Sequence, residues 1–212
     1  MKNENEPLGQ KPHALVLVCA LAALGGGVDT WGLLRLGDLN VSYMSGNTTG
    51  LGVALWHGQW SRAALIAGIA ALFVAGATAG EMIAYVAGRW RLPVLTLLTA
   101  ALLTTPALAP GWTVTAVVLA MGGLNAGMHQ AGGITISLTY VTGSLFRFGQ
   151  GLGRTLTGQH PGTAWLGQLV PWLGLSLGAG AVAGLQTTDA DLMVLLPLYA
   201  AALAAIAWWM EC

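Results

Sequence analysis

The segment Gly26-Gly27-Val28-Asp29, followed by Met44-Ser45-Gly46-Asn47, decides the fold of this chain, because both segments recur in its second half. The counterparts are Gly122-Gly123-Leu124-Asn125 and Val141-Thr142-Gly143-Ser144. They follow in the same order, about a hundred residues further on. One structural unit therefore occurs twice, which is an organisation typical of membrane transporters.

The match extends to a third pair of segments. Gly76-Ala77-Thr78-Ala79-Gly80 corresponds to Gly180-Ala181-Val182-Ala183-Gly184. Glycines one helical turn apart let two helix backbones approach closely. We therefore expect both segments to form packing faces, either within the chain or between two copies of it.

The composition indicates a membrane protein. Only 8% of the 212 residues are charged and 55% are hydrophobic, which is too little polar surface for a soluble globule of this size. Six apolar segments reach or approach the length of a membrane span, at 13–34, 61–87, 92–108, 113–128, 165–185 and 192–209. Two further segments, 43–56 and 140–156, are shorter and more polar.

The repeat divides the chain into a polar tail, 1–12, and two membrane repeats, 13–108 and 109–212, that form one membrane domain. The first apolar segment also has features of a cleavable signal peptide. However, it carries Asp29, whose position is matched by Asn125 in the second unit, so its removal would delete half of a duplicated feature. We expect the segment to be retained and the tail to be cytoplasmic.

The fold class is an all-α polytopic membrane protein. If the two short segments are re-entrant or broken, six helices span and most Lys and Arg residues lie on the cytoplasmic side, as the positive-inside rule prefers. This arrangement gives two inverted repeats, each with three spanning helices and one short helix. The alternative is eight spanning helices in parallel repeats.

The two short segments predict a solute site. A helix that begins inside a membrane presents unpaired N–H groups to a cavity lined by protein, and in inverted repeats two such helices commonly meet at the substrate. Hydroxyl and amide side chains there could cap the helices or bind solute. The candidate binding residues are Asp29, Ser45, Asn47, Thr48, Asn125, Thr142 and Ser144, with Trp31 and Tyr43 as an apolar wall.

Asp29 is the candidate for proton coupling, because a carboxylate within an apolar segment must be paired, protonated or hydrated. The alternative is a structural bond from Asp29 to Arg35 or to capping backbone groups. His129 and Glu81 are further candidates for a proton relay, although Glu81 could instead pair with Arg89.

Other function classes find no support. The chain has no His-Glu-x-x-His motif and no cysteine pattern for a metal site or disulfide framework. Paired titratable groups suited to catalysis are scarce. The net charge is zero, without a basic patch for nucleic acid. We expect no enzyme activity, no cofactor and no metal.

The chain resembles the YoaK-like proteins, the family known as DUF1275, through Gly26 to Asp29, the Ser45-Gly46-Asn47 motif and the Leu51-Gly52 pair that follows. Members usually carry Thr-Gly-Asn where this chain has Ser45-Gly46-Asn47. The resemblance covers essentially the whole chain. It implies a multi-pass protein of the bacterial inner (plasma) membrane and implies no substrate.

Together these features predict a small-solute membrane transporter with a central polar site between the N-termini of two short helices, coupled to protons through Asp29. Its partners would be the lipid bilayer, a small polar solute and a second copy in a homodimer. The alternatives are a channel for a small solute or ion, and a membrane protein that serves a structural or partner-binding role without transport.

Overall fold

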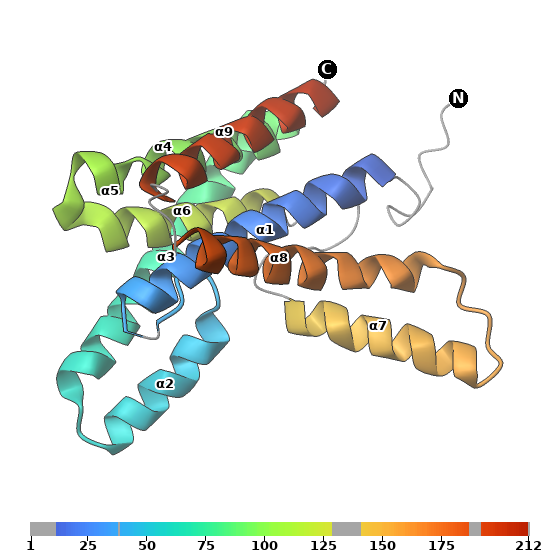
Figure 1. Ribbon diagram of the computed structural model, residues 1–212, viewed down its shortest axis with the longest axis horizontal. Helices are drawn as coiled ribbons and strands as arrows, with labels where there is room; N and C mark the ends of the chain where they lie inside the picture. Colours follow the sequence, from blue (N-terminus) through green and yellow to red (C-terminus); the bar gives the residue numbers. More distant parts are fainter. Residues whose placement is uncertain (1–11, 38, 129–140, 187–191, 212) are drawn as a thin grey trace.

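The computed structural model describes residues 12–37, 39–128, 141–186 and 192–211, and these residues form helices with no strand among them. Figure 1 shows their arrangement. The α-helices are α1 (Pro12–Arg35), α2 (Met44–Trp56), α3 (Trp60–Ala87), α4 (Arg91–Leu103), α5 (Thr105–Leu108), α6 (Thr113–Met128), α7 (Val141–Leu156), α8 (Val170–Leu185) and α9 (Leu192–Glu211). Short 3-10 helices, η2 (Gly88–Trp90), η3 (Pro110–Trp112) and η5 (Ala164–Leu169), join some of them.

Within the described chain, four stretches are long and apolar enough to cross a membrane: His13–Arg35, Trp60–Leu108, Ala164–Leu185 and Val194–Glu211. The second stretch contains α3, with 28 residues, and α4, with 13 residues, which α5 extends to Leu108. The chain turns between α3 and α4 at Gly88, whose φ of 56° suits glycine. By contrast, α2 has 13 residues and is about 20 Å long, too short to cross the hydrocarbon core. The predicted all-α multi-pass membrane protein is confirmed at this level.

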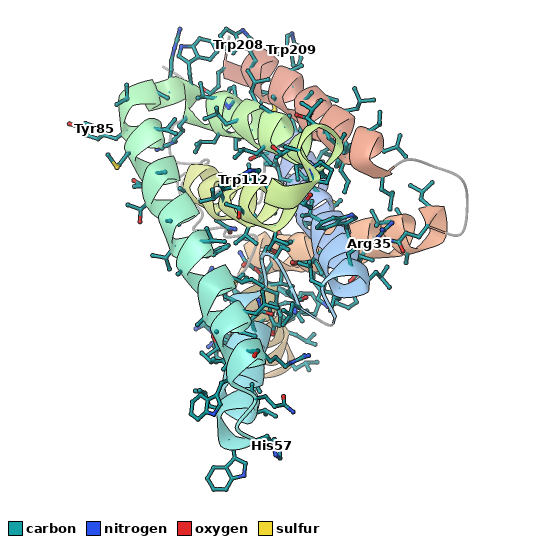
Figure 2. All side chains as sticks on the ribbon, turned by 90° about the vertical axis from the view of Figure 1, so that its left-hand side faces the viewer. Arg35, His57, Tyr85, Trp112, Trp208 and Trp209 are labelled. Carbon is teal, nitrogen blue, oxygen red and sulfur yellow. The ribbon has the colours of Figure 1, made fainter. Side chains whose placement is uncertain are left out.

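The helices pack in pairs that combine the two halves of the chain. α1 lies against α8, α3 against α6, and α4 against α9. The side chains of Leu21 and Leu24 on α1 and of Met121 and Leu124 on α6 are at most 1% exposed. α1 and α6 therefore form the centre of the molecule. Figure 2 shows Trp208 and Trp209, at the end of α9, on the same side of the molecule as Tyr85, and His57 at the opposite end of α3.

Glycines allow two of these pairs to pack backbone against backbone. A Cβ atom added to Gly26 would collide with the carbonyl of Leu175, and one added to Gly178 would collide with the carbonyl of Ala23, so α1 and α8 touch there. On the other side, a Cβ at Gly76 would collide with the backbone of Leu119 on α6. The expectation that the Gly76 to Gly80 segment forms a packing face is confirmed.

The packing face predicted at Gly180 and Gly184 makes no close contact within the described chain, and its alternative, a face between two copies, stays a prediction. A Cβ atom at either glycine would meet none of the described atoms within 4 Å, whereas Gly174 and Gly178 make the close contacts with α1. The structural counterpart of the Gly76 to Gly80 segment thus lies one to two turns earlier in α8 than the sequence match placed it. Both registers of α8 contain Gly-x-x-x-Gly, so sequence similarity alone could not choose between them.

Two apolar cavities lie at corresponding places in the two halves. One, of about 440 Å³, lies between α1, α8 and α9, and its lining includes Gly27 and Gly178. The other, of about 170 Å³, lies between α3, α4 and α6, and its lining includes Gly123 and Gly80. The helices that line one cavity are those that the sequence match pairs with the helices lining the other.

Replacing Gly178 by alanine tests the contact between α1 and α8. The added methyl group has no room against the backbone of Ala23, so we expect Gly178→Ala to lower the free energy of unfolding by about 1–3 kcal/mol. The matched control is Gly180→Ala on the same helix, which should be neutral or slightly stabilising because alanine favours the helix. Unfolding in mixed micelles measures both, and equal stabilities for the two variants would contradict this packing.

Candidate functional site

The link between α1 and α2 enters the interior of the protein. Leu39, Val41 and Ser42 are at most 3% exposed, although they belong to no helix. Gly32 of α1 makes room for the link, since a Cβ there would lie 3.0 Å from a methyl group of Val41 and 3.2 Å from the carbonyl oxygen of Leu39. Irregular backbone at membrane depth is tolerated only where the protein satisfies its polar groups, so the hydrogen bonds of this link need to be accounted for.

Asp29 satisfies one end of the link. Its Oδ1 accepts hydrogen bonds from the backbone N–H groups of Val41 at 2.8 Å and Ser42 at 2.7 Å, and its Oδ2 accepts one from the Ser42 hydroxyl at 2.5 Å. The carboxyl group is 7% exposed and lies nearly two turns before the end of α1. The structure therefore agrees with the structural alternative for Asp29, a bond to capping backbone groups, and the described residues give it no bond to Arg35.

The Asn47 side chain forms the hydrogen bonds that the other part of the link needs, at Asn40. Its Oδ1 accepts a hydrogen bond from the backbone N–H of Asn40 at 3.0 Å, and its Nδ2 donates one to the Asn40 carbonyl at 2.6 Å. The side chain amide thus pairs with one residue's backbone much as a neighbouring strand would. Asn47 is 2% exposed. In this structure the amide holds the link in place and is not directed at a cavity.

The prediction that hydroxyl or amide side chains cap the N-terminus of α2 is wrong. The residue before the helix is Tyr43, and no side chain forms a capping hydrogen bond there. The Asn47 side chain is hydrogen-bonded to the backbone of Asn40, and the Thr48 hydroxyl donates to the Met44 carbonyl of its own helix at 2.8 Å. Gly46 is needed for space, because a Cβ there would lie 3.0 Å from the Tyr43 ring.

The starts of α2 and α7 meet at the Tyr43 hydroxyl. The side chains of Ser45 and Thr142 lie beside it, close enough to interact with the phenol oxygen. Tyr43 is 38% exposed, and both Ser45 and Thr142 are exposed. Three of the predicted site residues, from both halves of the chain, are therefore brought together, and we call Tyr43, Ser45 and Thr142 the hydroxyl junction.

The remaining predicted site residues are divided between core and surface. Trp31, 5% exposed, packs in the hydrophobic core and lines no described cavity. Ser144 and Asn125 are buried, and the Asn125 amide donates to the Met121 carbonyl at 2.8 Å. Glu81 is exposed near the end of α3 and forms no ion pair with Arg89 in the described chain. His129 lies outside the described residues.

The sequence did not single out Asn40 or Ser42, which complete the two anchors of the link. Their partners are seven and thirteen residues away, distances with no helical or strand period, so no pattern marks them. The sequence offers only a weak indication of their role. Both are polar and lie on either side of Val41, in the short link between the helix that carries Asp29 and the Ser-Gly-Asn motif. Among the residues that the structure describes, no group of His, Cys, Asp or Glu is arranged to hold a metal ion.

Asp29→Asn tests the anchoring of the link. The variant keeps an acceptor for one N–H but loses the negative charge that serves three donors, so we expect it to lower the free energy of unfolding by about 2 kcal/mol. Glu81→Gln makes the same chemical change at an exposed position and should leave the stability in lipid-free detergent unchanged. Combined with Ser42→Ala, the Asp29 effect should be less than additive, because the two residues share a bond. Full additivity would contradict the arrangement.

Comparison with known proteins identifies the family. The model of the family described as protein of unknown function (DUF1275) matches residues 17–209. A UPF0700 transmembrane protein of Rhizobium meliloti (strain 1021) is 42% identical over 192 residues, which cover 89% of this chain and 83% of that protein. No solved structure matches the chain significantly. The chain therefore belongs to the DUF1275 family.

Proposed function

We propose that the protein transports a small polar solute, which passes the hydroxyl junction between α2 and α7. The observation that carries this proposal is the meeting of Tyr43, Ser45 and Thr142 at the starts of two short helices. All three hydroxyl groups belong to exposed residues. No side chain caps α2, and within the described chain only the first N–H of the helix, that of Met44, donates to the preceding Ser42 carbonyl, so the N–H groups of Ser45 and Gly46 are left for a solute or for water. Polar groups of this kind have little use inside a membrane unless something polar reaches them.

We further propose that the two halves are inverted repeats. In Figure 1, the sequence colours run along α1 from right to left, and along its counterpart α6 from left to right; α4 and α9 are opposed in the same way. The pairings of α1 with α8 and of α3 with α6 exchange into one another when the two units are exchanged. The two apolar cavities do the same. Transporters built in this way move by rocking one unit against the other around a central site.

The proposal divides the predicted site residues into two groups. Tyr43, Ser45 and Thr142 face the solute, and the hydroxyl of Thr48, one turn along α2, adds a further acceptor. Asp29 and Asn47 hold the link that positions α2, so they act on the solute through the backbone. Coupling to protons would then act through the link: a proton on Asp29 removes the charge that attracts three donors and loosens the start of α2.

Transport can be tested by a ligand screen followed by flux. Purified protein is screened by thermal unfolding against a panel of neutral, cationic and monoanionic solutes at two pH values, because a ligand that binds only the folded state raises the melting temperature. We expect a hit whose shift is at least halved in Thr142→Val and Tyr43→Phe. The control Thr78→Val replaces an exposed threonine of α3 that bonds only its own helix, and it should keep the full shift.

The flux of that hit into liposomes then separates the mechanisms. Saturable flux that depends on a pH gradient, with the gradient dependence lost in Asp29→Asn, supports a proton-coupled transporter. Flux that rises linearly with concentration indicates a channel. A panel without any hit, or a hit indifferent to Thr142 and Tyr43, would overturn the role of the hydroxyl junction and favour a structural function for the family.

We propose a cytoplasmic N-terminus and an inner-membrane location. Arg62 donates to the carbonyl of Gly37 at 3.4 Å, so the end of α1 and the start of α3 lie on one side, while Arg89 and Arg91 follow the other end of α3. With six spans, the positive-inside rule puts the turn at Arg89 in the cytoplasm. In a cysteine-free background, an impermeant thiol reagent should label a cysteine at position 35 in whole cells and not one at position 90. Labelling at 90 from outside would overturn this topology.

A further inference from the structure

A basic cleft lies at the end of α3, far from the hydroxyl junction. It has a volume of about 280 Å³, and its lining includes Glu81 and Tyr85 of α3, Arg89 and Arg91 of the following turn, and Ala126 of α6. It differs from the two apolar cavities because charged side chains supply much of its wall. The positive φ of Gly88 reverses the chain there and brings the two arginines back over the end of α3.

The aromatic residues around the cleft are of the kind found at the level of the lipid headgroups. The ring of Trp90, beside Arg89, stacks on the ring of Trp208 with their centroids 4.3 Å apart. Figure 2 shows Tyr85 and Trp208 on the same side of the molecule, and Tyr85 is 87% exposed. Tryptophan and tyrosine are enriched where hydrocarbon meets headgroups, because their rings have an apolar body and a polar edge.

Arg89 is prepared to bind an anion. Its guanidinium carbon lies 4.6 Å from the centre of the Trp90 ring, which orients the group while leaving the N–H donors at its edge available. Within the described residues Arg89 forms no ion pair, with Glu81 or any other acid. A planar guanidinium held in this way matches the oxygen atoms of a phosphate group.

We propose that this cleft binds the phosphodiester of an anionic phospholipid, with Arg89 as the principal contact. Basic pockets between transmembrane helices bind lipid headgroups by the same chemistry. Glu81 shares the cleft and repels negative charge, so it favours a phosphodiester with one charge over inorganic phosphate, whose mean charge at neutral pH lies between one and two. The cleft therefore selects a lipid headgroup over the free ion.

The test uses the full chain in detergent. Its melting temperature is measured as phosphatidylglycerol, or the zwitterionic phosphatidylcholine, is added to the micelles, and separately with inorganic phosphate against sodium chloride of equal ionic strength. We expect phosphatidylglycerol alone to stabilise the wild type strongly. Its apparent affinity should fall about fivefold in Arg89→Gln, the change expected for loss of one cation near a membrane surface.

Three further variants distinguish a built site from general charge. Arg62→Gln removes the same charge at the other end of α3 and should keep the wild-type affinity. Glu81→Gln should bind phosphatidylglycerol more tightly than the wild type, because the repulsion is gone. Arg89→Lys keeps the charge and should retain more affinity than Arg89→Gln, which also checks that a loss does not come from misfolding.

The proposal is overturned if Arg89→Gln and the wild type bind phosphatidylglycerol equally, or if Arg62→Gln loses as much affinity as Arg89→Gln. Equal stabilisation by phosphatidylcholine would mean that charge is irrelevant. Equal stabilisation by inorganic phosphate would show a site for a free anion and would overturn the assignment to a lipid. None of these outcomes bears on transport, so this proposal and the proposed function can fail separately.

Discussion

The three hydrogen bonds accepted by the Asp29 carboxylate are the interaction on which the candidate site depends. They fix the backbone of Val41 and Ser42 inside the protein, where these residues belong to no helix and need another partner for their N–H groups. With that backbone fixed, the chain enters α2 at the depth where Tyr43 meets Thr142. An acid in an apolar helix suggests a reacting group, yet here its first effect is to make a short, inward-starting helix possible.

The glycine contacts determine how whole helices pack, just as Asp29 determines how the link is held. Because Gly26 and Gly178 bring α1 and α8 into backbone contact, and Gly76 brings α3 against α6, the two halves of the chain interpenetrate instead of forming two separate bundles. In a bilayer, where lipid tails are as apolar as leucine, such close packing is a main source of helix association. The short helices pack differently: α2 lies on α3 and α7 on α8, so each is held by a long helix of its own half.

The hydroxyl junction and the turn after α3 differ in charge. The hydroxyl junction is polar and without cations, whereas arginine is found at the turn after α3, beside stacked aromatic rings. A neutral centre suits a small solute that must bind and leave, and a basic rim suits attachment to anionic lipid. The two proposals thus assign different chemistry to two separate regions, one central and one at the membrane surface.

The sequence by itself determined the membrane environment and the positions of the helices, and it predicted the duplication. A chain with so little charge and such long apolar segments has few alternatives to a membrane environment. The expected segments differ from the observed α-helices by only a residue or two at most ends. It also identified Asp29, Asn47 and Thr142 as unusual, because polar groups at such positions stand out against apolar surroundings, whereas it assigned Tyr43 to an apolar wall.

Only the tertiary structure decided what those groups do. Whether Asn47 caps a helix or pairs with Asn40, and whether Gly174 or Gly180 meets α1, depends on how segments distant in sequence approach one another. Hydrogen bonds over seven or thirteen residues follow no period, and α8 offers the same glycine spacing in two registers. Local pattern therefore fixed which elements form, while close packing and the need to satisfy buried backbone fixed how they meet.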